Sequence, residues 1–245
     1  MKHLLVACVV ALIAAVPCLS QEELPTAETL VESVASTWDP VQVRLLARMT
    51  VLQPGRPEVE TELLIRRAGS GRTRVDFLAP EKDKGKALLQ VGSETWLFLP
   101  RTGRVIEVPA KRSPLAGGVL FEDLFPGGES ETAGATVEAT DEAFVLTTQT
   151  VRSGGRKRRS GTSKIYFDRS TLLPMRREVY ASSGRLLKTV RIEKLGDWNG
   201  VKIPWAIHFE DHLRKGGQAR IEVVEATALT PEEEQLVSHE RLGEQ

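Results

Sequence analysis

The sequence has little cysteine, no long apolar run and no excess of charge of either sign. Its two cysteines, Cys8 and Cys18, both lie within the first twenty residues, so a chain that loses this segment has no disulfide. Small exported domains often depend on disulfides, whereas the roughly 225 residues that follow are enough to build a core by packing alone, as one large all-β domain. The 33 basic and 33 acidic side chains balance. This balance argues against a nucleic-acid partner, which usually requires a strong basic excess.

The longest apolar run, Leu4–Val16, follows the basic residues Lys2 and His3. Its thirteen residues are too few for a membrane-spanning helix, which needs about 20. A basic start, a short apolar stretch and small residues before a polar segment are typical of a secretory signal peptide. We therefore expect residues 1–20 to be removed between Ser20 and Gln21 and the protein to reside in the periplasm. A lipid-anchored form through Cys18 is the alternative, although proline precedes this cysteine and lipid-attachment sites favour a small residue there.

The mature chain begins with an apolar stripe at three- and four-residue spacing. Such a stripe is typical of an amphipathic helix, which Thr26 can cap and which Asp39–Pro40 ends. The stripe consists of Ala27, Leu30, Val31, Val34 and Trp38.

From Val41 the apolar period changes from 3.6 to two, which predicts a strand. Similar segments follow as far as residue 108 and again from 143 to 229, separated by turns such as 182–184 and 197–200 that contain Ser-Gly and Asn-Gly. With no crossover helices between them, about 10–11 strands predict a mainly β, antiparallel sheet in a single domain, residues 21–245. The charged tail, about residues 231–245, predicts a solvated helix.

Such a sheet must bury one face, and the predicted helices are too few to cover it. This shortage favours an apolar cavity. Side chains expected on matching strand faces, and therefore candidates to line it, are Val75, Phe77, Trp96 and Phe98. The glycine- and proline-rich segment 113–134 contains a short apolar piece that favours a lid, since long loops in compact domains are often functional. Its lid candidates are Phe121, Leu124 and Phe125.

Several short motifs stand in order through the middle of the chain. They are Phe77–Pro80, Asp83–Leu89, Glu94–Pro100, Gly103–Ile106, Ser113–Gly118, Phe121–Leu124, Leu173–Arg176 and Gly200–Pro204. In order and spacing they resemble the outer-membrane lipoprotein-sorting (LolA-like) family of periplasmic proteins, over residues 41–230.

This resemblance implies a half-closed antiparallel barrel with helices that form a lid over an apolar cavity. It implies a non-enzymatic protein, without metal or cofactor, that binds and transfers lipids or lipoprotein acyl chains. The alternative is a periplasmic sensor or accessory protein of a membrane exporter. We expect a monomer whose further partners are an inner-membrane transporter or an anionic membrane surface.

Two polar segments are candidates for a site. His208 and His212 would share a face on a helix, but the alternation from Val201 to Phe209 predicts a strand, on which residues four apart lie roughly 13 Å from each other, too far to share one metal ion. No Gly-x-Ser-x-Gly nucleophile motif occurs in the sequence.

The second segment is a basic turn between glycines, Arg156, Lys157, Arg158 and Arg159. It is either a solvated loop or a docking site for anionic head groups, where each basic residue near a membrane surface contributes about 1 kcal/mol.

Reversal of these four charges is expected to weaken binding to anionic vesicles while the melting temperature stays nearly unchanged. Vesicle sedimentation and thermal unfolding of the mature protein measure both quantities. Unchanged vesicle binding would exclude the docking role.

Overall fold

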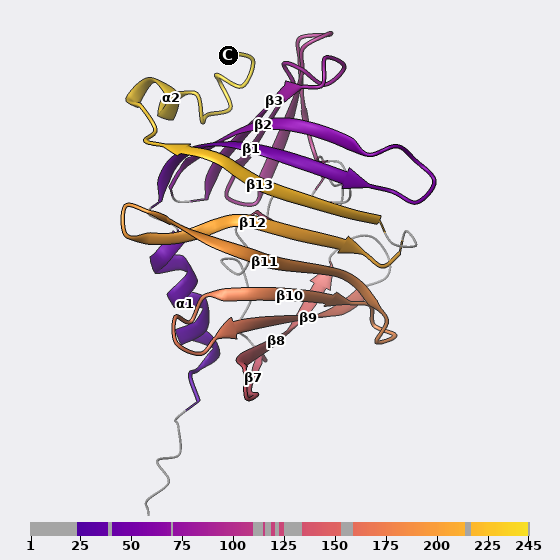
Figure 1. Ribbon diagram of the computed structural model, residues 1–245, viewed down its shortest axis with the longest axis vertical. Helices are drawn as coiled ribbons and strands as arrows, with labels where there is room; N and C mark the ends of the chain where they lie inside the picture. The colour runs from indigo at the N-terminus through magenta and orange to yellow at the C-terminus, as the bar shows by residue number, and fades with distance from the viewer. Residues whose placement is uncertain are drawn as a thin grey trace, which may run out of the picture.

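In the part of the chain that the structure describes, thirteen antiparallel strands form one open, curved sheet in a computed structural model (Figure 1). The described residues are 24–38, 41–69, 71–109, 115, 119–120, 123–124, 134–152, 159–213 and 217–244. The strands are β1 (Gln42–Leu52), β2 (Val59–Ala68), β3 (Arg72–Ala79), β4 (Ala87–Val91), β5 (Glu94–Leu99), β6 (Arg104–Glu107), β7 (Thr136–Ala139), β8 (Ala143–Arg152), β9 (Arg159–Asp168), β10 (Pro174–Tyr180), β11 (Leu186–Trp198), β12 (Val201–Asp211) and β13 (Gly217–Thr227). The helices of the described chain are α1 (Ala27–Trp38) and α2 (Pro231–Gln235).

The first and last strands meet in the middle of the sheet. The strand order is β6-β5-β4-β3-β2-β1-β13-β12-β11-β10-β9-β8-β7, so every neighbouring pair is consecutive in sequence except β1 and β13. Figure 1 shows β1–β3 in the upper part of the view, β7 and β8 at the bottom, and β13 to β10 between them. The predicted antiparallel, curved sheet is confirmed. The short strand β7 was not predicted from the sequence.

Two glycines shape the hairpin between β11 and β12. Asn199 and Gly200 have φ of 50° and 84°, the left-handed conformation that a tight hairpin turn requires, and this confirms the predicted turn. A Cβ at Gly196 would lie 2.0 Å from the ring of Trp205, so glycine is needed there for the indole on β12 to pack against β11.

Helix α1 is fixed at both ends. The hydroxyl of Thr26 accepts a hydrogen bond from the backbone N–H of Thr29 at 3.1 Å and caps the first turn. At the other end the carbonyl of Trp38 accepts two hydrogen bonds from the Arg67 guanidinium, at 3.1 and 3.0 Å, and the indole of Trp38 donates to the carbonyl of Lys202 at 2.7 Å. The predicted helix is confirmed, and its apolar stripe packs on the sheet with Ala27, Leu30, Val34 and Trp38 buried and Val31 partly buried.

We call the face of the sheet that contacts α1 the inner face. It carries the larger apolar cluster, which includes Met49 of β1, Phe77 of β3, Leu146 of β8 and Phe209 of β12. The opposite, outer face carries a smaller cluster over β2 to β5, formed by Ala68, Ala87 and Leu89 with Val91, Trp96 and Phe98, and covered by Leu229, Val237 and Leu242.

The C-terminal segment 229–244 therefore packs on the outer face. Arg74, whose side chain has no exposed surface, holds it there: its guanidinium donates to the carbonyls of Leu236 and Arg241, at 3.0 Å each, and to that of Glu244. The same guanidinium pairs with Asp76 at 2.8 Å. The predicted solvated helix is confirmed for α2, which buries no residue. For the rest of the tail the prediction is corrected, because Val237 and Leu242, five residues apart outside α2, are buried and gave no periodic signal.

Arg74→Met is expected to lower the free energy of unfolding by about 3–5 kcal/mol, because it removes one member of a buried charged network. Arg72→Met is the matched control: the Arg72–Glu234 pair is more than a third exposed on both sides, so its loss should cost less than about 1 kcal/mol. Urea unfolding measures both changes, and limited proteolysis should show faster cleavage within 229–244 for Arg74→Met alone. Equal losses for the two variants would contradict the assignment.

Candidate functional site

The inner face is covered by α1 and by the described apolar side chains of the connection between β6 and β7, Leu115, Val119 and Leu124. At about 4.8 Å between neighbouring strands, the thirteen strands of the described sheet extend over roughly 58 Å, whereas the twelve residues of α1 extend about 18 Å. The helix alone is too short to cover such a face. From the connection, Leu115, Val119 and Leu124 are buried in the inner-face cluster with exposures of 3%, 0% and 3%, and they extend the cover.

Asp123 places a carboxylate among these apolar side chains. The side chain has no exposed surface, and its Oδ2 lies 2.5 Å from Nζ of Lys188 on β11, which is 16% exposed. The same oxygen accepts a hydrogen bond from the backbone N–H of Leu120 at 2.8 Å, and the N–H of Asp123 donates to the carbonyl of Leu120 at 3.1 Å. This turn aims the carboxylate at the sheet, so the ion pair joins the connection to β11.

The other oxygen of this carboxylate is unsatisfied. Among the buried side-chain oxygen and nitrogen atoms of the described residues, only Oδ1 of Asp123 lacks a hydrogen-bond partner. Leaving a buried polar atom unpaired costs about 1–3 kcal/mol. Because desolvation can exceed the attraction within a buried ion pair, the pair positions the connection but is not an efficient way to stabilise it.

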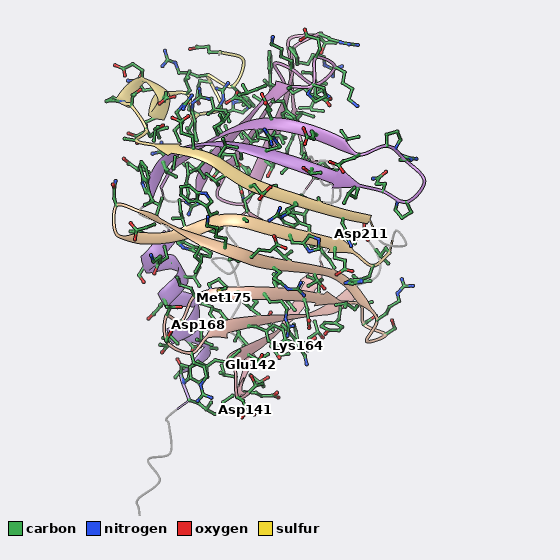
Figure 2. The ribbon with its side chains drawn as sticks, in the orientation of Figure 1. Asp141, Glu142, Lys164, Asp168, Met175 and Asp211 are labelled. Carbon is green, nitrogen blue, oxygen red and sulfur yellow. The ribbon has the colours of Figure 1, made fainter. Side chains whose placement is uncertain are left out.

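Further polar side chains surround Lys188 on the inner face. Lys188 stands two residues before Val190 on β11 and therefore on the same face of the strand. Val190 belongs to the inner-face cluster. On β10, Arg177 lies opposite Val190 and donates to the hydroxyl of Ser163 at 3.2 Å. On β12, Asp211 lies opposite Lys188, and Figure 2 labels it at the end of that strand. The inner face thus combines a broad apolar wall with a polar end that carries two basic side chains.

The structure separates the four side chains predicted to share one face. Val75 and Phe77 are buried in the inner-face cluster, whereas Trp96 and Phe98 pack in the outer-face cluster beside the C-terminal segment. The prediction of a common face is therefore wrong for Trp96 and Phe98. Val75 pairs with a residue of β4 that pairs in turn with Leu97 of β5, so Val75 shares a face with Leu97 and not with Trp96 or Phe98. Periodicity within each strand cannot show this register.

The lid and docking predictions fall mostly outside the described residues. Leu124 is described and buried, while Phe121 and Phe125 are not among the described residues. The same holds for Arg156, Lys157 and Arg158, and Arg159 is described only as the first residue of β9.

A polar cluster on the outer face of β9 and β10 was not predicted from the sequence. The hydroxyls of Tyr166 and Tyr180 both donate to Oε2 of Glu178, at 2.9 and 2.6 Å, and the Arg176 guanidinium lies 3.8 Å from the Tyr166 ring centroid. The bond to Glu178 raises the pKa of Tyr180 to about 12, and burial, followed by the bond to Glu178, raises the pKa of Tyr166. Both phenols keep their protons at neutral pH. The sequence signal for this cluster is the spacing of Arg176, Glu178 and Tyr180, which stand two residues apart and therefore on one face of the strand.

The strand predicted around His208 is confirmed, since this residue of β12 lies opposite Arg191 and Arg220, whereas His212 follows the end of β12 at Asp211. Within the described residues, no group of three or more histidine, cysteine or acidic side chains is arranged to hold a metal ion. No helix in that part of the chain is long and apolar enough to span a membrane.

Residues 69–243 match the model of a protein family described as "-like: Uncharacterized protein". Among solved structures, a LolA superfamily protein from Nitrosomonas europaea has 19% sequence identity and a TM-score of 0.69, over 88% of this chain and 99% of that one. A domain from Vibrio parahaemolyticus named as an outer membrane lipoprotein-sorting protein has 17% identity and a TM-score of 0.70, over 89% and 98% of the two chains. A DUF1329 family protein from Desulfovibrio piger has 15% identity and a TM-score of 0.68, over 88% and 97%. No curated protein matches the sequence. At such identities the likeness is one of fold.

Removal of one member of the Asp123–Lys188 pair, as in Lys188→Met, is expected to lower the free energy of unfolding by about 3–5 kcal/mol, because a buried charge is left unpaired. The double variant Asp123→Leu/Lys188→Met should be close to the wild type. Lys202→Met is the control, since the Lys202–Asp197 pair is about half exposed and should contribute less than about 1 kcal/mol. Chemical denaturation measures all three, and a double variant no better than Lys188→Met would show that the pair is not buried as described.

Proposed function

Because the chain belongs to the family of uncharacterized proteins whose model matches residues 69–243 and has the fold of the LolA superfamily, we propose that it binds a lipid or lipoprotein acyl chain on the inner face of its sheet. The ligand is bound without chemical change and is carried between membranes in the periplasm. The signal peptide predicted for residues 1–20 supports this location.

The cover of the inner face is the observation that carries the proposal. Its described part outside α1 consists of a few apolar side chains, Leu115, Val119 and Leu124, from the connection between two edge strands. Displacement of these side chains exposes part of the inner-face cluster, to which Val75 and Phe77 also belong, and the methylene groups of an acyl chain can cover it in their place. The connection then acts as a lid, and we include Phe121 and Phe125 in it.

The magnitudes suit a carrier. Each methylene removed from water contributes about 0.8 kcal/mol, so a chain of about twelve methylenes contributes roughly 10 kcal/mol. Association costs about 4 kcal/mol or more, and the lid side chains lose the burial that the ligand gains. The balance is an affinity that holds a lipid in transit and still permits its release.

Native mass spectrometry of the mature protein, purified without detergent, tests this proposal. Because both native cysteines lie within the first twenty residues, the double variant Asp123→Cys/Lys188→Cys carries the only thiols of the mature chain, and a short thiol-cleavable reagent can link the lid to β11. We expect the unlinked variant, delipidated and given palmitate, to bind it, the linked variant to bind none, and cleavage of the linker to restore binding.

The unlinked variant is the control for the two substitutions themselves. Equal palmitate binding before and after linking would place the chain elsewhere on the protein. Absence of any bound lipid from the wild type and from both forms of the variant would refute acyl-chain binding.

A further inference from the structure

We infer that Asp123 occupies the place of a ligand's anionic head group, and that the ligand is an amphiphile whose carboxylate or phosphate head pairs with Lys188 and Arg177. This inference rests on the proposed function, because it names the ligand class of the same site.

The first argument is the position of Lys188. It stands on the inner face, two residues from the buried Val190, and its charged end contacts the Asp123 carboxylate at 2.5 Å. A lysine at the border of an apolar wall, held by a carboxylate from a segment that covers this wall, has the arrangement of a head-group site occupied by part of the protein. When the lid moves, its carboxylate moves with it and Lys188 loses this partner.

The second argument is that Asp123 fills this place incompletely. Its carboxylate is fully buried, yet Oδ1 has no hydrogen-bond partner, whereas buried carboxylates ordinarily have partners on both oxygens. The turn at Leu120 directs Oδ2 to Lys188, so the reach of the connection, and not the needs of the carboxylate, decides where the group lies. A head group lying on the sheet itself is free of this restraint.

The third argument is the basic side chain on the neighbouring strand. Arg177 lies opposite Val190 while Lys188 lies opposite Val179, so Arg177 and Lys188 are diagonal neighbours on one face, with backbones about 7–8 Å apart. An anionic head between them can accept hydrogen bonds from both. Guanidinium and ammonium groups together are donors that suit the several oxygens of a carboxylate or a phosphate.

The charge balance selects against neutral and cationic heads. With the lid in place, Lys188 contacts the carboxylate of Asp123 and lies opposite Asp211 on β12. Among the described residues named here, departure of Asp123 leaves two basic side chains, Lys188 and Arg177, with one carboxylate, that of Asp211. An anionic head restores the balance, a neutral head leaves the excess, and a cationic head increases it.

Isothermal titration with dodecanoate and with dodecanol, which share their alkyl chain and differ in the head, tests the inference. The wild type is expected to bind dodecanoate about tenfold tighter than dodecanol, as one charged hydrogen bond provides, and dodecyl phosphate should behave like dodecanoate. Lys188→Met should reduce the difference, since Arg177 alone then pairs with the head, and Asp123→Asn, which removes the competing charge but retains the shape, should tighten dodecanoate binding severalfold. Arg191→Met is the matched control, because Arg191 is an exposed residue of the same strand that points to the outer face, and it should leave both affinities unchanged.

Acetate and inorganic phosphate, added alone, should not bind at the concentrations used. Binding of either as strong as that of dodecanoate would mean that the site takes a free anion and no chain, and would overturn the assignment to an amphiphile. Equal affinity for dodecanoate and dodecanol in the wild type would overturn the head-group site while leaving acyl-chain binding intact. If no amphiphile binds to any folded variant, the proposed function itself fails.

Discussion

The pairing of β1 with β13 is the constraint on which the rest of the structure depends. Because the chain starts and finishes its sheet in the middle, the strands β6 and β7 become the two edges. Consecutive strands elsewhere are joined by short turns, but the chain must travel from one edge to the other through residues 108–135. The described apolar side chains of this connection lie against the inner face. A cover made of loop residues is therefore a consequence of the strand order.

The two faces of the sheet are covered in physically different ways. On the outer face, each of the three nitrogens of the buried Arg74 donates hydrogen bonds, to Asp76 and to three carbonyls of the C-terminal segment. On the inner face, the buried Asp123 of the connection has one oxygen without a partner. A buried charge with all its hydrogen bonds made loses many of them when its cover moves away. A buried charge with an unpaired oxygen loses fewer. This difference is consistent with the proposal that the inner cover gives way to a ligand while the outer cover stays in place.

The likeness in fold to LolA superfamily proteins and the chemistry of the inner face are two independent observations, and both support the proposed function. The solved structures share the arrangement of the strands at low identity, which says nothing about particular side chains. The apolar wall, the Asp123–Lys188 pair and the neighbouring Arg177 are properties of this chain. They are the features from which we infer that the ligand carries an anionic head group.

The sequence by itself determined the local elements: helix α1, the alternating strands and the Asn199–Gly200 turn are set by side-chain period and by backbone conformations that depend on near neighbours. It did not determine which faces of distant strands coincide. Val75 and Trp96 have equally good strand patterns, and only pairing through β4 places them on opposite faces. Two further contacts depend on register and strand order. One is the ion pair of Asp123 with Lys188, sixty-five residues apart. The other is the burial of Val237 and Leu242 in the segment to which Arg74 donates hydrogen bonds. These are decided by the packing of the whole sheet, because no contact of this kind leaves a period in the sequence.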